Sequence, residues 1–335
     1  MLELQQYYPD DRIRIIQRNN GKYQVVVNTD YSQEETEQEI QQIKSKAIAD
    51  GTFMKAPNGN PTNLNERQWL QVRTKNFINW FGDWINDPAN ASKVVDENGE
   101  PLVVYHGSDN VFTTYDLSKS DDNSTIFTTN NINIADSYIS DVEFYGIPPE
   151  TLNKNDFTKE EWESIEKQYE ADVEDYEKRK ANQLKPIHLF NNIKNPFILD
   201  ANNRGYDELS IEGYSGSFNT REVAAFAKEK GYDGVILLNI KDAGSVKAVT
   251  YTKREITQEL IDYAEVYGFD INELLYVPNV ESATIYISFN PNQIKSATDN
   301  VGAFSRKDNN IYQNREITIP QAAQTLINNG LESLR

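Results

Sequence analysis

Alternating hydrophobic and polar positions predict a β-hairpin near the start of the chain. The stretch RIRIIQRNNGKYQVVV alternates around Asn20-Gly21, a pair that accepts the positive φ angles of a tight turn. Ser32 and Glu35 then match a capping box, and apolar residues recur at helical spacing after them. Residues 1–52 are therefore expected to form a small αβ appendage.

A segment rich in tryptophan follows the appendage. It opens with FMKAPNGNPTN, where Pro, Gly and Asn favour a linker, and continues as NERQWLQVRTKNFINWFGDWINDP. The second stretch holds three of the four tryptophans of the chain, Trp69, Trp80 and Trp84. Because aromatic side chains bury a large apolar area, we interpret them as packing anchors that hold a helical connector, residues 53–93, onto the next domain.

Beyond the connector, strand and helix patterns are mixed. Apolar or alternating runs predict strands at 103–106, 125–129, 186–190, 196–199, 234–238, 247–252 and 283–289, and helical periodicity marks 131–140, 158–184, 220–230 and 256–267. Strict βαβ alternation is missing, so this order favours an α+β fold over a doubly wound sheet. No G-x-G-x-x-G follows a strand and no P-loop pattern occurs, which excludes those two kinds of nucleotide site.

The helix predicted at 158–184 combines an apolar stripe with a heavily charged outer face. We interpret it as a solvated surface helix within an insertion at about residues 149–185. Covering a cleft or binding a partner is the alternative. The tail, residues 307–335, is polar and then shows a helical pattern in which Pro320 suits the first turn, so a docking helix is expected there.

Composition and charge exclude several classes of function. The chain has no cysteine, which excludes disulfides, cysteine-ligated metals and cysteine nucleophiles. Its 33 basic and 52 acidic residues leave a net charge of −19, which argues against general nucleic-acid binding. No apolar run is long enough for a membrane helix, and the start lacks the layout of a signal peptide. We expect a soluble intracellular protein with no membrane partner.

Candidate chemistry is concentrated around one of the two histidines. His106 and His188 have no metal-ligand spacing around them, so no metal site is expected. His106 ends an apolar strand and is followed at once by Gly107 and Ser108. Glycine lets a ligand approach the backbone and serine adds a hydroxyl donor, so this strand end predicts a binding site. A structural, hydrogen-bonded histidine is the alternative.

Three segments resemble a known family. VVYHGS at 103–108, TIFTTNNINIADSYI at 125–139 and YISFNPNQIKSATDN at 286–300 are similar to the ADP-ribosyltransferase domain of phage and mobile-element polyvalent proteins. The Trp-rich lead-in strengthens the resemblance, which covers about residues 53–315. It implies an ADP-ribosyltransferase fold over residues 94–306, with split, mainly antiparallel sheets, flanking helices and an extended cleft for NAD.

The resemblance also implies roles for individual residues. The wider clan includes the poly(ADP-ribose) polymerases, whose catalytic signature is a histidine, a tyrosine and a glutamate on three segments. By similarity, His106 would bond the adenine-side ribose, while the backbone of Gly107 and the hydroxyl of Ser108 would hold the nicotinamide amide. Tyr138 would stack on the nicotinamide ring, and Phe127 would line the same pocket. Without the resemblance, a core tyrosine on a helix face is the favoured interpretation of Tyr138.

The sequence departs from the family at the third signature position. The alignment places Ile285 where the polymerases have their catalytic glutamate. Cleavage of the nicotinamide–ribose bond builds oxocarbenium character that a carboxylate stabilises, and isoleucine cannot do this. Glu281 lies on the same strand face but about 13 Å away at ~3.3 Å per residue. Glu281 could substitute only if the strand shifts or bulges.

The resemblance implies a mono-ADP-ribosyltransferase that uses NAD as its substrate, without a metal. Its acceptor would be a protein, with host proteins among the candidates. Two other functions stay open: a non-catalytic binding or virion-carried structural module, and an NAD glycohydrolase. The Asn-rich composition fits a low-GC bacterium or its phage, so the place of action would be the bacterial cytoplasm or a virion.

Overall fold

The computed structural model describes residues 13–17, 23–27, 33–119, 125–300, 302–306 and 308–312. The appendage contains the antiparallel strands β1 (Ile13–Gln17) and β2 (Tyr23–Val27), followed by α2 (Gln33–Ala49). The predicted Asn20-Gly21 turn, the Ser32 cap and the helix after Pro320 lie outside the described residues.

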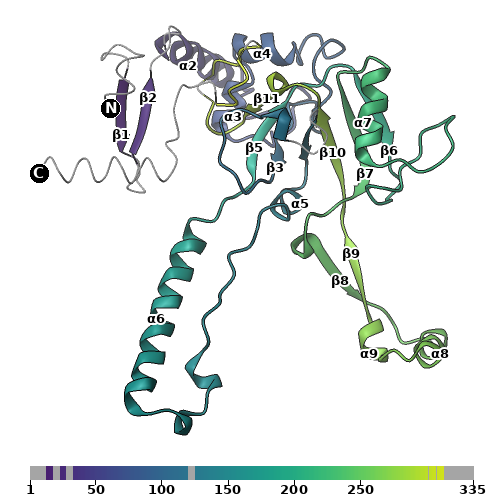
Figure 1. Cartoon of the computed structure of the whole chain (residues 1–335). Helices are drawn as coiled ribbons and strands as arrows, with labels where there is room; N and C mark the ends of the chain where they lie inside the picture. Colours follow the sequence, from purple (N-terminus) through teal and green to yellow (C-terminus); the bar gives the residue numbers. More distant parts are fainter. Residues whose placement is uncertain are drawn as a thin grey trace, which may run out of the picture.

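A seven-stranded sheet forms the centre of the described chain (Figure 1). Its order is β11-β5-β3-β4-β10-β7-β6, and neighbours are antiparallel except for the parallel pair β6 and β7. The strands are β3 (Val104–His106), β4 (Ile126–Thr129), β5 (Ile187–Asn191), β6 (Pro196–Asp200), β7 (Gly234–Lys241), β10 (Ser282–Ser288) and β11 (Ile294–Ser296). The predicted α+β class with a mainly antiparallel sheet is confirmed.

The sheet is split between β3 and β4. Within the described residues these two strands share one ladder pair, Tyr105↔Thr129, whereas β10 pairs with β7 along nearly its whole length. Beyond Tyr105 the two halves of the sheet part, and backbone groups that a continuous ladder would use are left for other partners. One of them, the carbonyl of Phe127, accepts a hydrogen bond from the ring of His106 across the gap.

The helical connector belongs to the core of one sheet half. Its helices are α3 (Glu66–Gln71) and α4 (Lys75–Phe81). Trp69, Trp80 and Trp84 are buried in one cluster with Phe190 of β5 and Phe304. Each indole N–H donates to a backbone carbonyl, which removes the cost of burying a polar group. These tryptophans therefore pack the connector against the sheet.

Helix α7 (Thr220–Glu229) covers the other half of the sheet. Its start is a capping box, in which the Asn219 side chain accepts from the backbone N–H of Glu222 and the Glu222 side chain accepts from that of Asn219. Val223, Ala224 and Ala227 recur at helical spacing and are buried against β7. Thr220 and Arg221, the first two residues of α7, line the site described below.

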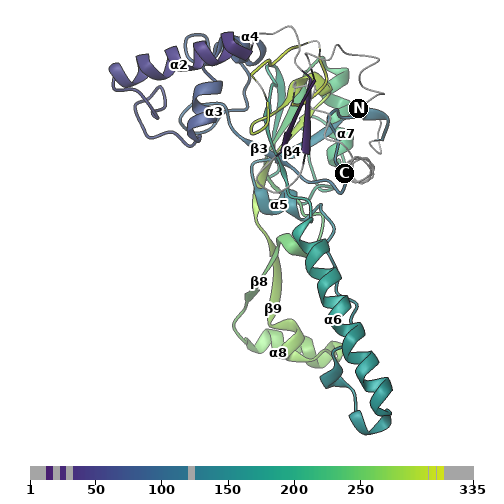
Figure 2. The ribbon, with the colours of Figure 1, turned by 90° about the vertical axis from the view of Figure 1, so that its left-hand side faces the viewer.

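Two arms project from the end of the body at which α5 (Ile132–Asp136) lies (Figures 1 and 2). The first carries α6 (Lys159–Ala181), and the second pairs β8 (Val249–Lys253) with β9 (Tyr276–Val280) and ends in α8 (Gln258–Tyr267) and α9 (Ile271–Leu274). Short 3₁₀ helices occur at Leu117–Lys119, Pro149–Thr151, Lys154–Asp156, Val246–Ala248 and Pro291–Gln293. Sequence patterns missed β9, which contains Pro278, and β11, which has three residues.

Helix α6 packs on the chain segment that leads to it rather than on the sheet. Thr158 and Glu161 form its capping box, and Glu174–Lys178 and Asp175–Arg179 are i,i+4 ion pairs along the helix. The apolar stripe is covered by Phe144, whose ring meets those of Tyr169 and Tyr176 edge-on at 5.8 and 5.3 Å. The arm thus has a thin apolar seam of its own.

Removing this arm is expected to leave the body folded. Gln183 donates to the carbonyl of Ser140 at 3.2 Å, so the two ends of the arm already lie together, and a short Gly/Ser linker can replace Phe144–Ala181. Because the seam contributes little to the central core, we expect the melting temperature to change by no more than about 4 °C, equivalent to ~1 kcal/mol. Differential scanning calorimetry of the full chain and the deletion variant measures this. A large cooperative loss of stability would show that the arm belongs to the core.

Candidate active site

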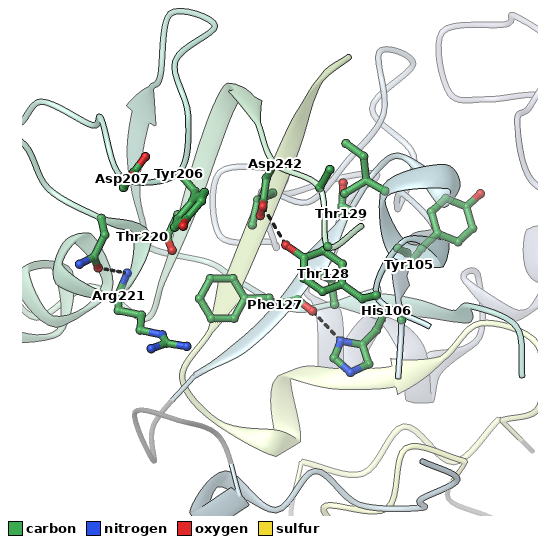
Figure 3. Close-up of a pocket in the computed structure, with 18 residues that line it drawn as sticks. Tyr105, His106, Phe127, Thr128, Thr129, Tyr206, Asp207, Thr220, Arg221 and Asp242 are labelled. Atoms are coloured by element: carbon green, nitrogen blue, oxygen red, sulfur yellow. Dashed lines mark hydrogen bonds between the residues drawn. The ribbon is translucent and has the colours of Figure 1, made fainter. Parts of the chain in front are cut away.

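A cavity of about 700 Å³ opens where β3 and β4 part (Figure 3). This volume lies within the usual range of small-molecule sites. Its lining includes Tyr105, His106, Gly107, Phe127, Thr129, Ile134, Tyr138, Tyr206, Asp207, Arg221, Asp242, Gly244 and Ile285. In the view of Figure 3, His106 and Tyr105 stand on one side and Tyr206, Asp207 and Arg221 on the other, with Phe127 and Asp242 between them.

His106 is held in one tautomer and one orientation. Its Nδ1 lies 2.7 Å from the carbonyl oxygen of Phe127, which can only accept, so Nδ1 carries the proton and Nε2 is an acceptor. The rings of Phe112 and Tyr115 meet the imidazole edge-on at 6.0 and 5.1 Å. Burial lowers the pKa of His106, so the ring is neutral at pH 7. His106 therefore offers a fixed acceptor suited to a hydroxyl donor.

Gly107 is the point at which helix α5 touches the sheet. A Cβ atom at this position would lie 1.8 Å from the carbonyl oxygen of Ala135 and 3.1 Å from Cβ of Tyr138. Only glycine permits this approach, and the approach places Tyr138 beside the end of β3. Ser108 does not line the cavity, and its Oγ accepts from the backbone N–H of Asn110 at 3.1 Å.

Tyr138 leaves the helix and enters the cavity because α5 is shorter than the pattern at 131–140 predicts. Ser137 is the C-cap of the helix, and its hydroxyl donates to the carbonyl of Ile134 at 2.6 Å. Tyr138 is 46% exposed, and its hydroxyl donates to Oδ1 of Asp242 at 2.7 Å. Burial and this carboxylate raise the pKa of Tyr138, so the phenol stays protonated.

The segment after β7 fixes the Tyr138 ring from the other side. A Cβ on Gly244 would lie 2.6 Å from the Tyr138 ring, so the backbone there packs directly against the ring. The N–H of Gly244 donates to Oγ of Ser137 at 2.9 Å. Lys247 donates to the carbonyl of Ile139 at 2.6 Å and pairs with Asp141 at 2.8 Å. The aromatic face toward the cavity is thereby held in place.

Ile285 lies on the cavity wall but belongs to the apolar core. It is 3% exposed and packs in one buried cluster with Leu237 and Ile287. Glu281 lies between β9 and β10, outside the cavity lining, and accepts from the amide of Asn131 at 3.5 Å. The structure brings His106, Gly107, Phe127, Tyr138 and Ile285 together and leaves Glu281 and Ser108 outside.

The far wall of the cavity was missed by sequence reasoning. It consists of Tyr206, Asp207, the start of α7 at Thr220 and Arg221, and Asp242 at the end of β7. Asp242 carried little signal, because the predicted strand ends at 238 and the polar residues Asn239 and Lys241 come before Asp242. The other residues lie in a polar stretch of the sequence with no distinguishing motif.

A family model described as "ADP-Ribosyltransferase in polyvalent proteins" matches residues 96–304. The chain belongs to this family. Comparison with curated proteins and with solved structures gives no match. Membership in the ADP-ribosyltransferase family implies NAD as the substrate, and the resemblance found from the three segments is confirmed.

The lining of this ADP-ribosyltransferase cavity fits a dinucleotide with a planar cationic ring. The cavity offers a neutral acceptor at His106 and the aromatic rings of Phe127 and Tyr138. Among the described residues, none of the helices combines the length and apolar character that a membrane span requires. The described part also contains no group of three or more His, Asp or Glu side chains placed to hold a metal ion.

Proposed function

We propose that the protein is an NAD-dependent mono-ADP-ribosyltransferase that modifies a protein acceptor. The observation that supports this most directly is the pairing, in one cavity, of a neutral His106 with Nε2 as acceptor and a Tyr138 ring held by its neighbours. The family implies NAD as the substrate, and these two groups match a hydroxyl of its adenine-side ribose and its nicotinamide ring.

In the proposed complex, His106 accepts a hydrogen bond through Nε2 from a hydroxyl of the adenine-side ribose, and Gly107 presents its backbone to the nicotinamide amide. Tyr138 stacks on the nicotinamide ring while Phe127 closes the same pocket. These contacts orient the substrate so that the bond between nicotinamide and ribose faces the open part of the cavity. Orientation of this kind contributes to rate because the reacting groups no longer have to find one another.

A protein acceptor is favoured by the position of the two arms. The first arm leaves the body just after Ser140 and the second just after Lys247, both within a few residues of the cavity-lining Tyr138 and Gly244. Together these arms offer surface for a macromolecule beside the cavity. We propose that the reaction takes place in a bacterial cytoplasm. The protein would be expressed there or delivered from a phage virion.

Calorimetric titration with NAD tests the binding step. Wild type should bind NAD, and His106→Ala and Tyr138→Ala should each weaken the Kd by at least about tenfold, the loss of roughly one hydrogen bond or stacking contact. His188→Ala is the matched control, because His188 lies on neighbouring β5 and outside the cavity lining. Absence of heat and of a thermal shift at millimolar NAD would overturn the assignment.

Labelled NAD incubated with bacterial lysate tests the transfer step. Label that becomes covalently attached to protein supports the transferase. Nicotinamide release that needs no acceptor and leaves protein unlabelled would identify an NAD glycohydrolase instead. Binding without either reaction would identify a non-catalytic module.

A further inference from the structure

A carboxylate stabilises the positive charge that develops at the reacting carbon in ADP-ribosyl transfer, and Ile285 supplies none. Two carboxylates line the cavity among the described residues, Asp207 and Asp242. Asp207 is exposed on the far wall. Asp242 is partly buried, and Tyr138 donates to its Oδ1 at 2.7 Å. Asp242 is thus the acidic residue hydrogen-bonded to Tyr138, on which the nicotinamide ring would stack.

The pairing of β7 with β10 decides which way Asp242 points. Paired residues of antiparallel strands project to the same face of a sheet, and successive residues alternate between faces. Ile285 pairs with Leu237, and Ala283 pairs with Ile240. Between these pairs β10 advances by two residues while β7 advances by three, so β7 contains a bulge.

This bulge reverses the alternation for the end of β7. Asn239, inside the extra stretch, has a φ of 50°, the left-handed conformation that asparagine tolerates. In an unbroken strand Asp242, five positions beyond Leu237, would face away from the side that Ile285 occupies. The additional residue returns Asp242 to that side, in keeping with the tendency of bulges to re-aim side chains beside active sites.

We propose that Asp242 is the catalytic carboxylate of this transferase, taking over from a neighbouring strand the task that Ile285 cannot perform. This proposal rests on the proposed function. When the bond between N1 of nicotinamide and C1′ of ribose breaks, its electron pair stays on N1 and neutral nicotinamide leaves. Asp242 stabilises the positive charge on the ribose until the acceptor nucleophile forms its bond to C1′ and releases its proton to solvent. No oxidant or reductant takes part.

The environment of Asp242 fits this task. Burial raises the pKa of Asp242, while hydrogen bonds from Tyr138 and from the Ala243 backbone act in the opposite direction and favour the ionised form. Catalytic sites commonly hold a partly buried carboxylate in a cavity even though its burial lowers the stability of the folded protein. The Tyr138 hydroxyl and the Ala243 backbone both orient the carboxylate, so its charge is in place before the reaction begins and one of the two hydrogen bonds remains when the other is removed.

The decisive variant is Asp242→Asn, in which the amide oxygen can still accept from Tyr138. Nicotinamide release should fall by about 10²–10³, the usual effect of losing one preorganised electrostatic group. The Kd for NAD, measured by calorimetry, should stay within about threefold of the wild-type value. Since the substitution removes a partly buried charge, the melting temperature at pH 7 should be no lower than that of wild type. Tyr138→Phe separates catalysis from positioning: it deletes the hydrogen bond and keeps the ring, so it should retain far more activity than Asp242→Asn.

Each result assigns or overturns the role of Asp242. If Asp242→Asn stays active, the catalytic role of Asp242 is overturned while the proposed transferase function stands. The same holds if Asp207→Asn or Glu281→Gln loses activity and Asp242→Asn does not. Equal losses in Asp242→Asn and Tyr138→Phe would reduce Asp242 to a positioning residue and overturn its catalytic role. If wild type binds NAD and releases no nicotinamide, the proposed function itself fails, and the catalytic role fails with it.

Discussion

Replacing Arg73 with methionine is expected to lower the free energy of unfolding by about 3–5 kcal/mol, because it leaves a buried carboxylate without its counter-charge. Arg73 donates through Nη2 to Oε1 of Glu100 at 2.8 Å, with side-chain exposures of 12% and 0%. The Glu100 carboxylate also accepts from the Thr62 hydroxyl. Methionine retains much of the contact that the guanidinium makes with Trp69, whose ring centre is 3.7 Å away.

Urea denaturation measures this loss as a shift of the midpoint at constant slope. The double variant Arg73→Met with Glu100→Gln is the control, since removing both charges should recover much of the stability that the single change loses. An unchanged midpoint in Arg73→Met, or no recovery in the double variant, would contradict the explanation. Arg73 belongs to the connector and Glu100 to the family domain, so a single cooperative transition is also expected.

Alanine at Gly107 is expected to cost about 3 kcal/mol of stability and to weaken NAD binding together with it. The added Cβ would meet the carbonyl oxygen of Ala135 at 1.8 Å, a backbone atom that cannot rotate aside. Helix α5 must then move off the sheet, and it carries Tyr138 away from His106. Thermal denaturation and NAD calorimetry on the same preparation report the two effects.

Gly205→Ala is the matched control for this substitution. Gly205 lies next to cavity-lining Tyr206, and its nearest contact for an added Cβ is the flexible carboxylate of Asp207 at 3.4 Å, an ordinary van der Waals distance. We expect stability to stay within about 1 kcal/mol of wild type, because alanine also restricts the unfolded chain. Comparable losses at Gly107 and Gly205 would show that the close approach of α5 is not the cause.

Local patterns in the sequence were sufficient for most of the elements. Strands such as β5 and β10 and the helix α7 have apolar periodicities that span their whole length, and these periodicities depend on near neighbours alone. The patterns failed for β9 and β11 because pairing with a distant partner, rather than local preference, makes those residues extended. The end of α5 was also mistaken: the helical pattern continues past Ser137, but Ser137 and Tyr138 hydrogen-bond there to the distant residues Gly244 and Asp242.

The near wall of the site was predictable and the far wall was not. His106 stands at a strand end, and the family resemblance points to Phe127 and Tyr138. Tyr138 and Asp242 are about a hundred residues apart in the chain. They meet because the sheet order places β7, which Asp242 follows, two strands from β4. The face on which Asp242 lies depends further on one bulge residue, Asn239. Periodicity along one strand cannot reveal such a change, because a bulge exists only in the pairing of two strands, and that pairing is formed by the tertiary structure.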